Sequence, residues 1–485
     1  MGFVSIQNVS FSYQADSQGH GISEISLEIQ KGECVLLCGK SGSGKTTISK
    51  LVNGLIPHFE TGRKTGVVLL DGMDTEKIPI YKISYKVASV FQNPKSQFFN
   101  INAEDEIVFS LENHGADLSK LEERLRATVK ELQISGLMKK NLFEMSGGEK
   151  QVIAFACAYA FSPDIIVLDE PSSNLDLGAI RAIRGVIGKM KCQGKTVIIA
   201  EHRFAYLKEL IDSAVYIENG KIKRRYSAEE FYSLSEQKRK EMGLRQLHSC
   251  HEISIVPSRY RSANRTAHSL ELKNVCISFG KNTILRNISF LLRSGDIAAI
   301  IGTNGVGKSS LCRTICGFFE CSSGEIIIDG TALKKSKRLK KSYIVMQDTN
   351  CQLFAESVYN ECELGNSSVS KEKIIEMLQR LELADEMESH PQSLSGGQKQ
   401  RLAIAVAVLA GKQIIILDEP TSGLDFAGMM SVSRLIKELS EMGLIILVIT
   451  HDMEFLEAAC NRCFQLNSQG IREVCSIQVE KFFCE

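Results

Sequence analysis

The chain has 485 residues, which is too long for one ordinary hydrophobic core and suits two domains of typical size. Hydrophobic residues make up 44% and charged residues 24%, as in soluble globular proteins, and no apolar run reaches the roughly 18 residues that a membrane-spanning helix needs. The formal net charge of +1 argues against a nucleic-acid binder driven by overall charge, because neutralising phosphates needs a surplus of Lys and Arg. The amino terminus, MGFVSIQNVS, lacks a charged start followed by an apolar stretch, so we expect no export.

Three motifs occur twice along the chain, in the same order. GKSGSGKTT at 39–47 recurs as GTNGVGKSS at 302–310, MSGGEKQ at 145–151 as LSGGQKQ at 394–400, and IIVLDEP at 165–171 as IIILDEP at 414–420. The later motifs keep one spacing, since Ser146 to Ser395 and Asp169 to Asp418 are both 249 positions apart (395−146, 418−169). Such self-similarity predicts two domains of one fold. We expect them at residues 1–235 and 269–485, with the polar, basic segment 236–268 as the linker.

Each copy contains a glycine-rich loop between an apolar strand and a helix-like pattern, which is the context that a phosphate-binding loop requires. Glycines let the backbone wrap closely around a polyphosphate, so that its N–H groups and the next helix N-terminus point at the negative charge. The residues expected to bind the phosphates are Gly39, Ser41, Gly42, Gly44, Lys45, Thr46 and Thr47 in the first copy, and Gly302, Asn304, Gly305, Gly307, Lys308, Ser309 and Ser310 in the second. We expect the two lysines to reach the β- and γ-phosphates, and Thr46 and Ser309 to ligate Mg²⁺.

Downstream of each loop, an apolar run of the kind that forms a buried parallel strand ends in two acids. We expect Asp169 and Asp418 to hold Mg²⁺ through water, and Glu170 and Glu419 to polarise the water that attacks the γ-phosphate. A positioned base of this kind contributes about 10²–10⁴ in rate. Acids at a strand end can also be simple helix caps, and that reading stays open at this point.

The SGG motifs, each followed by the apolar strand and its acids, resemble the signature of ABC-type ATPases, and the resemblance covers the chain outside the linker. It implies a D-loop at Asp176 and Asp425, a switch histidine at His202 and His451, and a Q-loop glutamine at Gln92 and Gln347 that touches Mg²⁺ and the attacking water. It also implies adenine stacking on Tyr13 and Phe279. The signature residues expected to contact nucleotide are Ser146, Gly147 and Gly148 in the first copy, and Ser395, Gly396, Gly397 and Gln398 in the second.

The same resemblance explains why two copies are present. A phosphate loop alone leaves part of the negative charge of the γ-phosphate unstabilised. The signature serine and the backbone N–H groups at the helix N-terminus of the other copy supply this stabilisation. We therefore expect the two domains to pair within the chain around ATP and Mg²⁺. The first signature departs from the family pattern at Met145, Glu149 and Val152. We expect an outward Glu149 side chain and two working sites.

The Q-loop segments carry a second glutamine whose presence hydrolysis does not require. FQNPKSQFF at 91–99 with NAEDEIVFSLEN at 102–113, and QDTNCQLFAESV at 347–358, resemble the duplicated ATPases of energy-coupling factor (ECF) transporters. Lys95, Ser96, Ser110, Asp348 and Cys351 depart from that pattern. The resemblance implies a peripheral subunit on the cytoplasmic face of the cell membrane, with no nucleic-acid partner. Each copy would grip one coupling helix of a transmembrane (T) protein. A local spacer with no partner role remains the alternative.

The expected fold class is α/β, with two tandem P-loop ABC ATPase domains, each combining a mainly parallel sheet, a small antiparallel β region and a helical subdomain. The expected function is ATP hydrolysis that powers uptake of a vitamin, a vitamin precursor or a metal ion, with a substrate-capturing (S) membrane protein selecting the cargo. One rival is a fused ATPase of sugar or peptide importers, although both sites here keep every catalytic position. A soluble two-domain ABC protein acting on ribosomes is the other, although those carry a longer, strongly charged linker.

Overall fold

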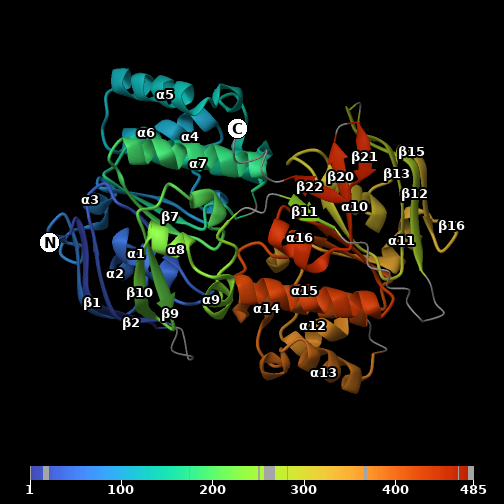
Figure 1. Cartoon of the computed structure of the whole chain (residues 1–485). Helices are drawn as coiled ribbons and strands as arrows, with labels where there is room; N and C mark the ends of the chain where they lie inside the picture. Colours follow the sequence, from blue (N-terminus) through green and yellow to red (C-terminus); the bar gives the residue numbers. More distant parts are fainter. Residues whose placement is uncertain are drawn as a thin grey trace. The chain divides into compact units, whose positions relative to one another are not determined.

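The computed structural model divides the chain into two compact units between residues 249 and 250 (Figure 1). The residues that it describes are 2–14, 21–173, 175–248, 252–255, 268–280, 282–364, 369–467 and 469–478. Among these residues, no helix combines the length and the apolar character needed to cross a bilayer.

The first unit holds ten strands and nine α-helices in the part of the chain that is described. The strands are β1 (Val4–Tyr13), β2 (Gly21–Ile29), β3 (Cys34–Cys38), β4 (Gly62–Leu70), β5 (Met73–Asp74), β6 (Val87–Val90), β7 (Ile165–Asp169), β8 (Thr196–Ala200), β9 (Ser213–Glu218) and β10 (Lys221–Ser227). The helices are α1 (Lys45–Val52), α2 (Leu55–His58), α3 (Ile80–Ser84), α4 (Ala103–Asn113), α5 (Leu118–Leu132), α6 (Gly147–Phe161), α7 (Leu177–Cys192), α8 (Ala228–Tyr232) and α9 (Glu236–Glu241).

The second unit repeats the central part of this order, and strands β11 and β22 are added at its two ends. Its strands are β11 (Glu252–Ser254), β12 (Ser269–Phe279), β13 (Asn282–Arg293), β14 (Ile297–Ile301), β15 (Ser323–Ile328), β16 (Thr331–Ala332), β17 (Ser342–Val345), β18 (Ile414–Asp418), β19 (Ile445–Ile449), β20 (Arg462–Asn467), β21 (Gly470–Glu473) and β22 (Ser476–Gln478). Its helices are α10 (Lys308–Cys316), α11 (Lys335–Lys341), α12 (Val358–Leu364), α13 (Lys371–Arg380), α14 (Gly396–Leu409), α15 (Phe426–Glu441) and α16 (Met453–Ala459).

Each unit is built on a six-stranded sheet that is parallel except at one edge. The strand orders are β10-β9-β3-β8-β7-β6 and β17-β18-β19-β14-β20-β21, and only the outermost hairpins, β9–β10 and β20–β21, are antiparallel. The central strands are buried along their length, which is why they read as unbroken apolar runs in the sequence. A four-stranded antiparallel sheet lies beside each, in the orders β2-β1-β4-β5 and β13-β12-β15-β16. The expected fold class is therefore confirmed.

A helical subdomain follows the glutamine segment in each unit. Helices α4, α5 and α6 pack together in the first unit, as α12, α13 and α14 do in the second (Figure 1). The small apolar side chains of α6 and α14 are buried on nearly every side, since each of these helices also contacts the core sheet. The helical subdomain is thus anchored to the sheet by the helix that begins at the signature turn.

Parts of the segment expected as linker are folded. Residues 236–248 belong to the first unit, where Met242, Leu244 and Leu247 are buried in the core around β9 and α8. Strand β11 belongs to the second unit and pairs antiparallel with β22, with Ile253 opposite Ile477. The rest of the segment, residues 249–251 and 256–267, lies outside the described residues.

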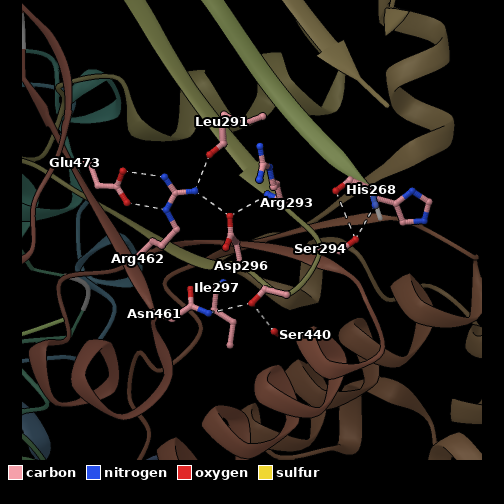
Figure 2. A network of polar contacts seen from close by, with 11 residues as sticks. His268, Leu291, Arg293, Ser294, Asp296, Ile297, Ser440, Asn461, Arg462 and Glu473 are labelled. Carbon is pink, nitrogen blue, oxygen red and sulfur yellow. Dashed lines mark hydrogen bonds and ion pairs between the residues drawn. The ribbon is translucent and has the colours of Figure 1, made fainter. Parts of the chain in front are cut away.

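Arg462 fastens the two sheets of the second unit together (Figure 2). Its guanidinium donates two hydrogen bonds to the Glu473 carboxylate, at 2.6 and 2.8 Å, one to Asp296 at 2.9 Å and one to the Leu291 carbonyl at 2.6 Å. The planar fork of Arg suits several acceptors at once. In the first unit Arg225 does the same work from the neighbouring strand, bonding to Glu33 and to the Glu28 carbonyl.

Arg462→Ala should lower the unfolding free energy of the second unit by about 1–3 kcal/mol, because two partly buried carboxylates lose their donor. Native-state hydrogen exchange of β20 measures this unit by itself. The matched control is Arg380→Ala, which removes only an exposed ion pair with Glu376 and should change stability by less than about 0.5 kcal/mol. Equal losses in both variants would contradict a fastening role for Arg462.

Candidate ATP sites

The predicted site residues gather at one edge of each core sheet. In the first unit, β8 lies between β3 and β7, and all three strands are parallel. In the second unit, β19 lies between β14 and β18 in the same way. Their carboxyl ends therefore meet at the same edge, where open α/β sheets bind ligands. The phosphate loop follows β3 or β14, the acid pair ends β7 or β18, and the switch histidine follows β8 or β19.

Each glycine-rich loop closes around the side chain of its own lysine. Lys45 Nζ donates to the carbonyls of Gly39 and Lys40 at 3.1 and 2.9 Å, and Lys308 Nζ to those of Gly302 and Thr303 at 2.7 and 3.0 Å. These bonds hold the ammonium group inside the loop. At Gly39, φ is 149° and an added Cβ would collide with the Ile217 carbonyl oxygen, so the loop requires glycine there.

A hydroxyl and a carboxylate form a pair beside each loop. Thr46 Oγ1 donates to Asp169 Oδ1 at 3.1 Å, and Ser309 Oγ to Asp418 Oδ2 at 3.1 Å. Burial raises the pKa of both aspartates, so their charge is costly without a cation. Among the residues described, no three His, Cys, Asp or Glu side chains gather as a metal cluster. One carboxylate with a hydroxyl is the kind of partial ligand set that Mg²⁺ shares with phosphate oxygens.

Glu170 and Glu419 adopt a strained backbone conformation. Their φ angles are 46° and 50°, in the left-handed region that non-glycine residues seldom occupy. Such outliers gather at functional sites. Gln92 Nε2 donates to Glu170 Oε2 at 2.7 Å, and Ser173 Oγ donates to the same oxygen at 3.2 Å. Burial, and next the charge of Glu201, raise the pKa of Glu170 to about 8.

The switch histidines lie over these glutamates. His202 Nε2 is 3.6 Å from Glu170 Oε1, and His451 Nε2 is 3.7 Å from Glu419 Oε1. His202 Nε2 is buried and has no hydrogen-bond partner among the described residues, whereas His451 Nε2 is 3.1 Å from Asn304 Oδ1 of the phosphate loop. Burial, and next the charges of Lys45 and Arg245, hold the pKa of His202 well below its usual value. The imidazole is therefore neutral at pH 7.

The signature turns are helix N-termini with complete capping boxes. Ser146 caps α6, with its hydroxyl accepting from Glu149 N and the Glu149 carboxylate accepting from Ser146 N at 2.9 Å; Ser395 and Gln398 repeat this at α14. The Glu149 carboxylate also binds Lys140 Nζ at 2.5 Å. Although burial opposes its charge, these bonds lower the pKa of Glu149. The Glu149 carboxylate therefore caps the start of its own helix and forms an ion pair with Lys140.

The D-loop aspartates cap the next helices. Asp176 accepts from Ala179 N at the start of α7, and Asp425 from Gly428 N at the start of α15, both at 2.8 Å. Of the two residues expected to stack on adenine, Tyr13 is half-buried with its hydroxyl 3.2 Å from Thr47 Oγ1. Phe279 is exposed and packs edge-on against Phe319 at 5.0 Å. Tyr13 therefore contacts its phosphate-loop helix directly.

The glutamine segments differ in how the first glutamine lies. Both first glutamines are exposed, but Gln92 donates a hydrogen bond to Glu170, whereas no such bond joins Gln347 to Glu419 among the described residues. The second glutamine of each segment forms a hydrogen bond to the backbone of its own loop, a role that the sequence did not predict. Gln97 Oε1 accepts from Phe91 N at 3.1 Å, and Gln352 Oε1 from Met346 N at 2.7 Å, so each holds the backbone where the strand ends.

A buried glutamate fixes the end of each glutamine segment. Glu106 accepts from the N–H groups of Phe99 and Asn100, and Glu361 from those of Phe354 and Ala355, at 2.7 to 3.0 Å. The Phe99 and Phe354 side chains are each 76% exposed. Both units thus present a phenylalanine to solvent at a turn that is hydrogen-bonded to a buried glutamate.

Glu201 is the site residue that the sequence analysis did not single out. It lies between β8 and His202, is 2% exposed, and acts on the pKa of Glu170. Comparing AEHR at 200–203 with ITHD at 449–452 would have found it, because the copies differ on both sides of the histidine.

The side chains fit ATP and Mg²⁺ on their own chemistry. Each site combines a cationic lysine inside a glycine loop, a hydroxyl–carboxylate pair for a hard cation and a glutamate beside a histidine. In the first site, a phosphate oxygen would give the buried His202 Nε2 a hydrogen-bond partner. A cation would stabilise the charged form of Asp169, whose pKa burial raises.

Comparisons with known proteins agree with this arrangement. The family model described as ABC transporter matches residues 22–173 and 285–422. A Treponema denticola protein described as an ABC transporter ATP-binding protein is 46% identical over 479 residues, covering 97% of each chain. A Bacillus subtilis protein, YkoD, described as an HMP/thiamine import ATP-binding protein, is 30% identical over 495 residues, covering 96% of this chain and 90% of its own.

Among solved structures, one titled as ribosome-bound archaeal Pelota and ABCE1 matches with a TM-score of 0.67 and 23% identity, covering 98% of this chain and 79% of that one. At this identity the likeness shows the fold alone. The match of both units to the family model, together with the near full-length relatives, shows that the chain belongs to the ABC transporter ATP-binding family, whose members are ATPases.

Proposed function

We propose that the protein is the ATP-hydrolysing subunit of an ECF-type importer, located peripherally at the cytoplasmic face of the membrane. The observation that carries this proposal is the braced glutamine segment, present in both units with an exposed phenylalanine at its end. Hydrolysis needs neither the second glutamine nor the phenylalanine. The full-length similarity to YkoD, whose name refers to HMP/thiamine import, supports uptake of a vitamin or related solute.

Each site residue has a role that its contacts support. Lys45 and Lys308 bind the β- and γ-phosphates; Thr46 with Asp169 and Ser309 with Asp418 hold Mg²⁺, which neutralises phosphate charge when bound. Glu170 and Glu419 accept the proton of the attacking water, while Gln92 and Gln347 orient that water. His202, as a neutral donor, binds the γ-phosphate in the first site, and His451 binds it in the second. Tyr13, and more weakly the exposed Phe279, stack on adenine.

Both sites are proposed to work, with the two units pairing inside one chain. The signature turn of each unit offers uncompensated N–H groups at a helix N-terminus, which suits a γ-phosphate bound in the other unit. Glu149 does not prevent anion binding at the first signature turn, because its carboxylate accepts from Ser146 N and pairs with Lys140. In this scheme ATP joins the units and hydrolysis separates them.

Affinity purification of the chain from gently solubilised membranes of its host tests the partner. We expect polytopic membrane proteins in near-stoichiometric amounts, one as the T protein and a smaller one as the S protein. Ribosomal proteins with no membrane protein would overturn the importer and favour the ribosomal rival. A periplasmic-type sugar or peptide permease pair would favour the other rival.

The double variant Phe99→Ala, Phe354→Ala should lose the membrane partner while the isolated subunit keeps its ATPase rate. Exposed aromatic anchors of this kind commonly contribute more than about 1 kcal/mol each to binding, so recovery of the partner should fall by about tenfold or more. Phe59→Ala, at a side chain that is 78% exposed on the first unit, is the matched control and should recover the partner normally. Equal recovery of the partner with the double variant and with Phe59→Ala would contradict docking at the glutamine segments.

A further inference from the structure

The Glu201 carboxylate joins two catalytic loops of the first unit. Its Oε1 accepts from the N–H groups of His202 at 2.7 Å and Arg203 at 3.0 Å. Its Oε2 accepts from Ser172 N at 3.2 Å and from the Tyr206 hydroxyl at 2.9 Å. Ser172 lies two residues after Glu170, so one buried carboxylate holds the histidine loop against the glutamate loop.

The second unit makes this connection with a different residue. Asp452 Oδ2 accepts from Thr421 Oγ1 at 2.6 Å, and its Oδ1 accepts from Phe455 N at the start of α16. Asp452 N in turn donates to Thr450 Oγ1 at 3.0 Å. Asp452 is 4% exposed, so it too is a buried carboxylate tying the histidine loop to the glutamate loop.

The two arrangements are alternatives encoded by three positions. With the repeat offset of 249, position 201 corresponds to 450, 203 to 452 and 206 to 455. The paired residues are Glu201 and Thr450, Arg203 and Asp452, and Tyr206 and Phe455. In the first unit the carboxylate (Glu201) precedes the histidine, and the Tyr206 hydroxyl donates to it. In the second unit the carboxylate (Asp452) follows the histidine, and phenylalanine replaces the tyrosine. We infer that Glu201 is the positioning residue of the first ATP site, where it holds the His202 loop against the Glu170 loop as Asp452 does in the second unit.

The test measures kcat and KM of the isolated full chain for ATP separately, because a misplaced base lowers kcat while the phosphate loop still sets nucleotide binding. Glu201→Thr, which removes the brace, should lower kcat by about 10- to 10²-fold through misplacement. Adding Arg203→Asp to Glu201→Thr rebuilds the arrangement of the second unit, with Ser172 supplying the hydroxyl, and should recover most of the loss.

Two observations separate positioning from a general loss of structure. KM for ATP should stay within about twofold in every variant, because Lys45, Thr46 and Asp169 are untouched. Rescue by the second substitution is the other, since a general loss of structure would not be reversed by adding Arg203→Asp.

An unchanged kcat in Glu201→Thr would overturn the inference, as would failure of the Arg203→Asp addition to raise kcat above that of Glu201→Thr. The inference rests on the proposed hydrolysis at the first site but not on the importer. These assays use no membrane partner, so failure to purify a T protein would refute the importer and leave Glu201 untouched.

Discussion

Glu170→Gln and Glu419→Gln should each lower the ATPase kcat of the intact chain by about 10²-fold or more, the size of a positioned base's contribution. Glutamine keeps the side-chain volume and can still bond to Gln92 or His202, but it cannot accept the proton of the attacking water. Both variants should still bind ATP, because the phosphate loop and the hydroxyl–carboxylate pair are untouched. Steady-state hydrolysis and nucleotide binding, measured on the same preparations, separate the two effects.

Glu325→Gln, an exposed glutamate in β15, is the control and should hydrolyse ATP at the normal rate. If one of the two catalytic variants kept full activity, the corresponding site would hold ATP without turnover and our assignment of two working sites would fail. The strained backbone at both glutamates favours equal roles, since a site that had lost catalysis would have no need to keep a residue in the left-handed region.

Lys45→Ala and Lys308→Ala should each remove one nucleotide from the chain. Each ammonium group is already held in its loop by two carbonyls, so the protein provides a preformed cation for the phosphates. Losing charge-assisted hydrogen bonds worth about 1.5–3 kcal/mol weakens ATP binding by about 10- to 10²-fold at that site. Calorimetric titration should find the stoichiometry falling from about two ATP per chain to about one, as expected of two independent phosphate loops.

The control is Lys40→Thr, which exchanges an exposed loop lysine for the residue that the second unit has at the matching position, Thr303. Its stoichiometry should stay normal. Unchanged stoichiometry in both alanine variants would show that the glycine loops do not bind the phosphates.

Much of this architecture could be predicted from local pattern. The apolar runs that became β3, β7, β14 and β18 are buried on both faces, and only a parallel sheet covered by helices leaves so little room for polar residues. Because parallel strands end at one edge, the sites in each unit followed from the order of the motifs. The assignments of individual residues within them remain predictions that the experiments above address.

What the sequence could not provide was the detail that depends on tertiary contact. Gln97 looked like part of a docking surface, yet its amide braces the backbone at Phe91, a bond that forms only once the loop has folded back. Met242, Leu244 and Leu247 sit in a basic, aperiodic stretch, so their burial against the first core had no periodic signal. A comparison of the two copies singles out Glu201, but its bonding role could not be predicted, because its partners come from four different positions.

The pairing of β11 with β22 shows that the second folded unit includes residues that lie outside the sequence repeat. Sequence similarity between the copies begins after residue 268, but the second fold uses Glu252–Ser254, and Ile255 N adds a bond to the Cys475 carbonyl at 2.9 Å. A fragment cut at residue 269 would leave the strand around Ile477 with an open edge and an uncovered apolar side chain, both of which invite aggregation. Any attempt to express the second half alone, or to transplant it into another tandem protein, should therefore cut near residue 250, within the segment that joins the units.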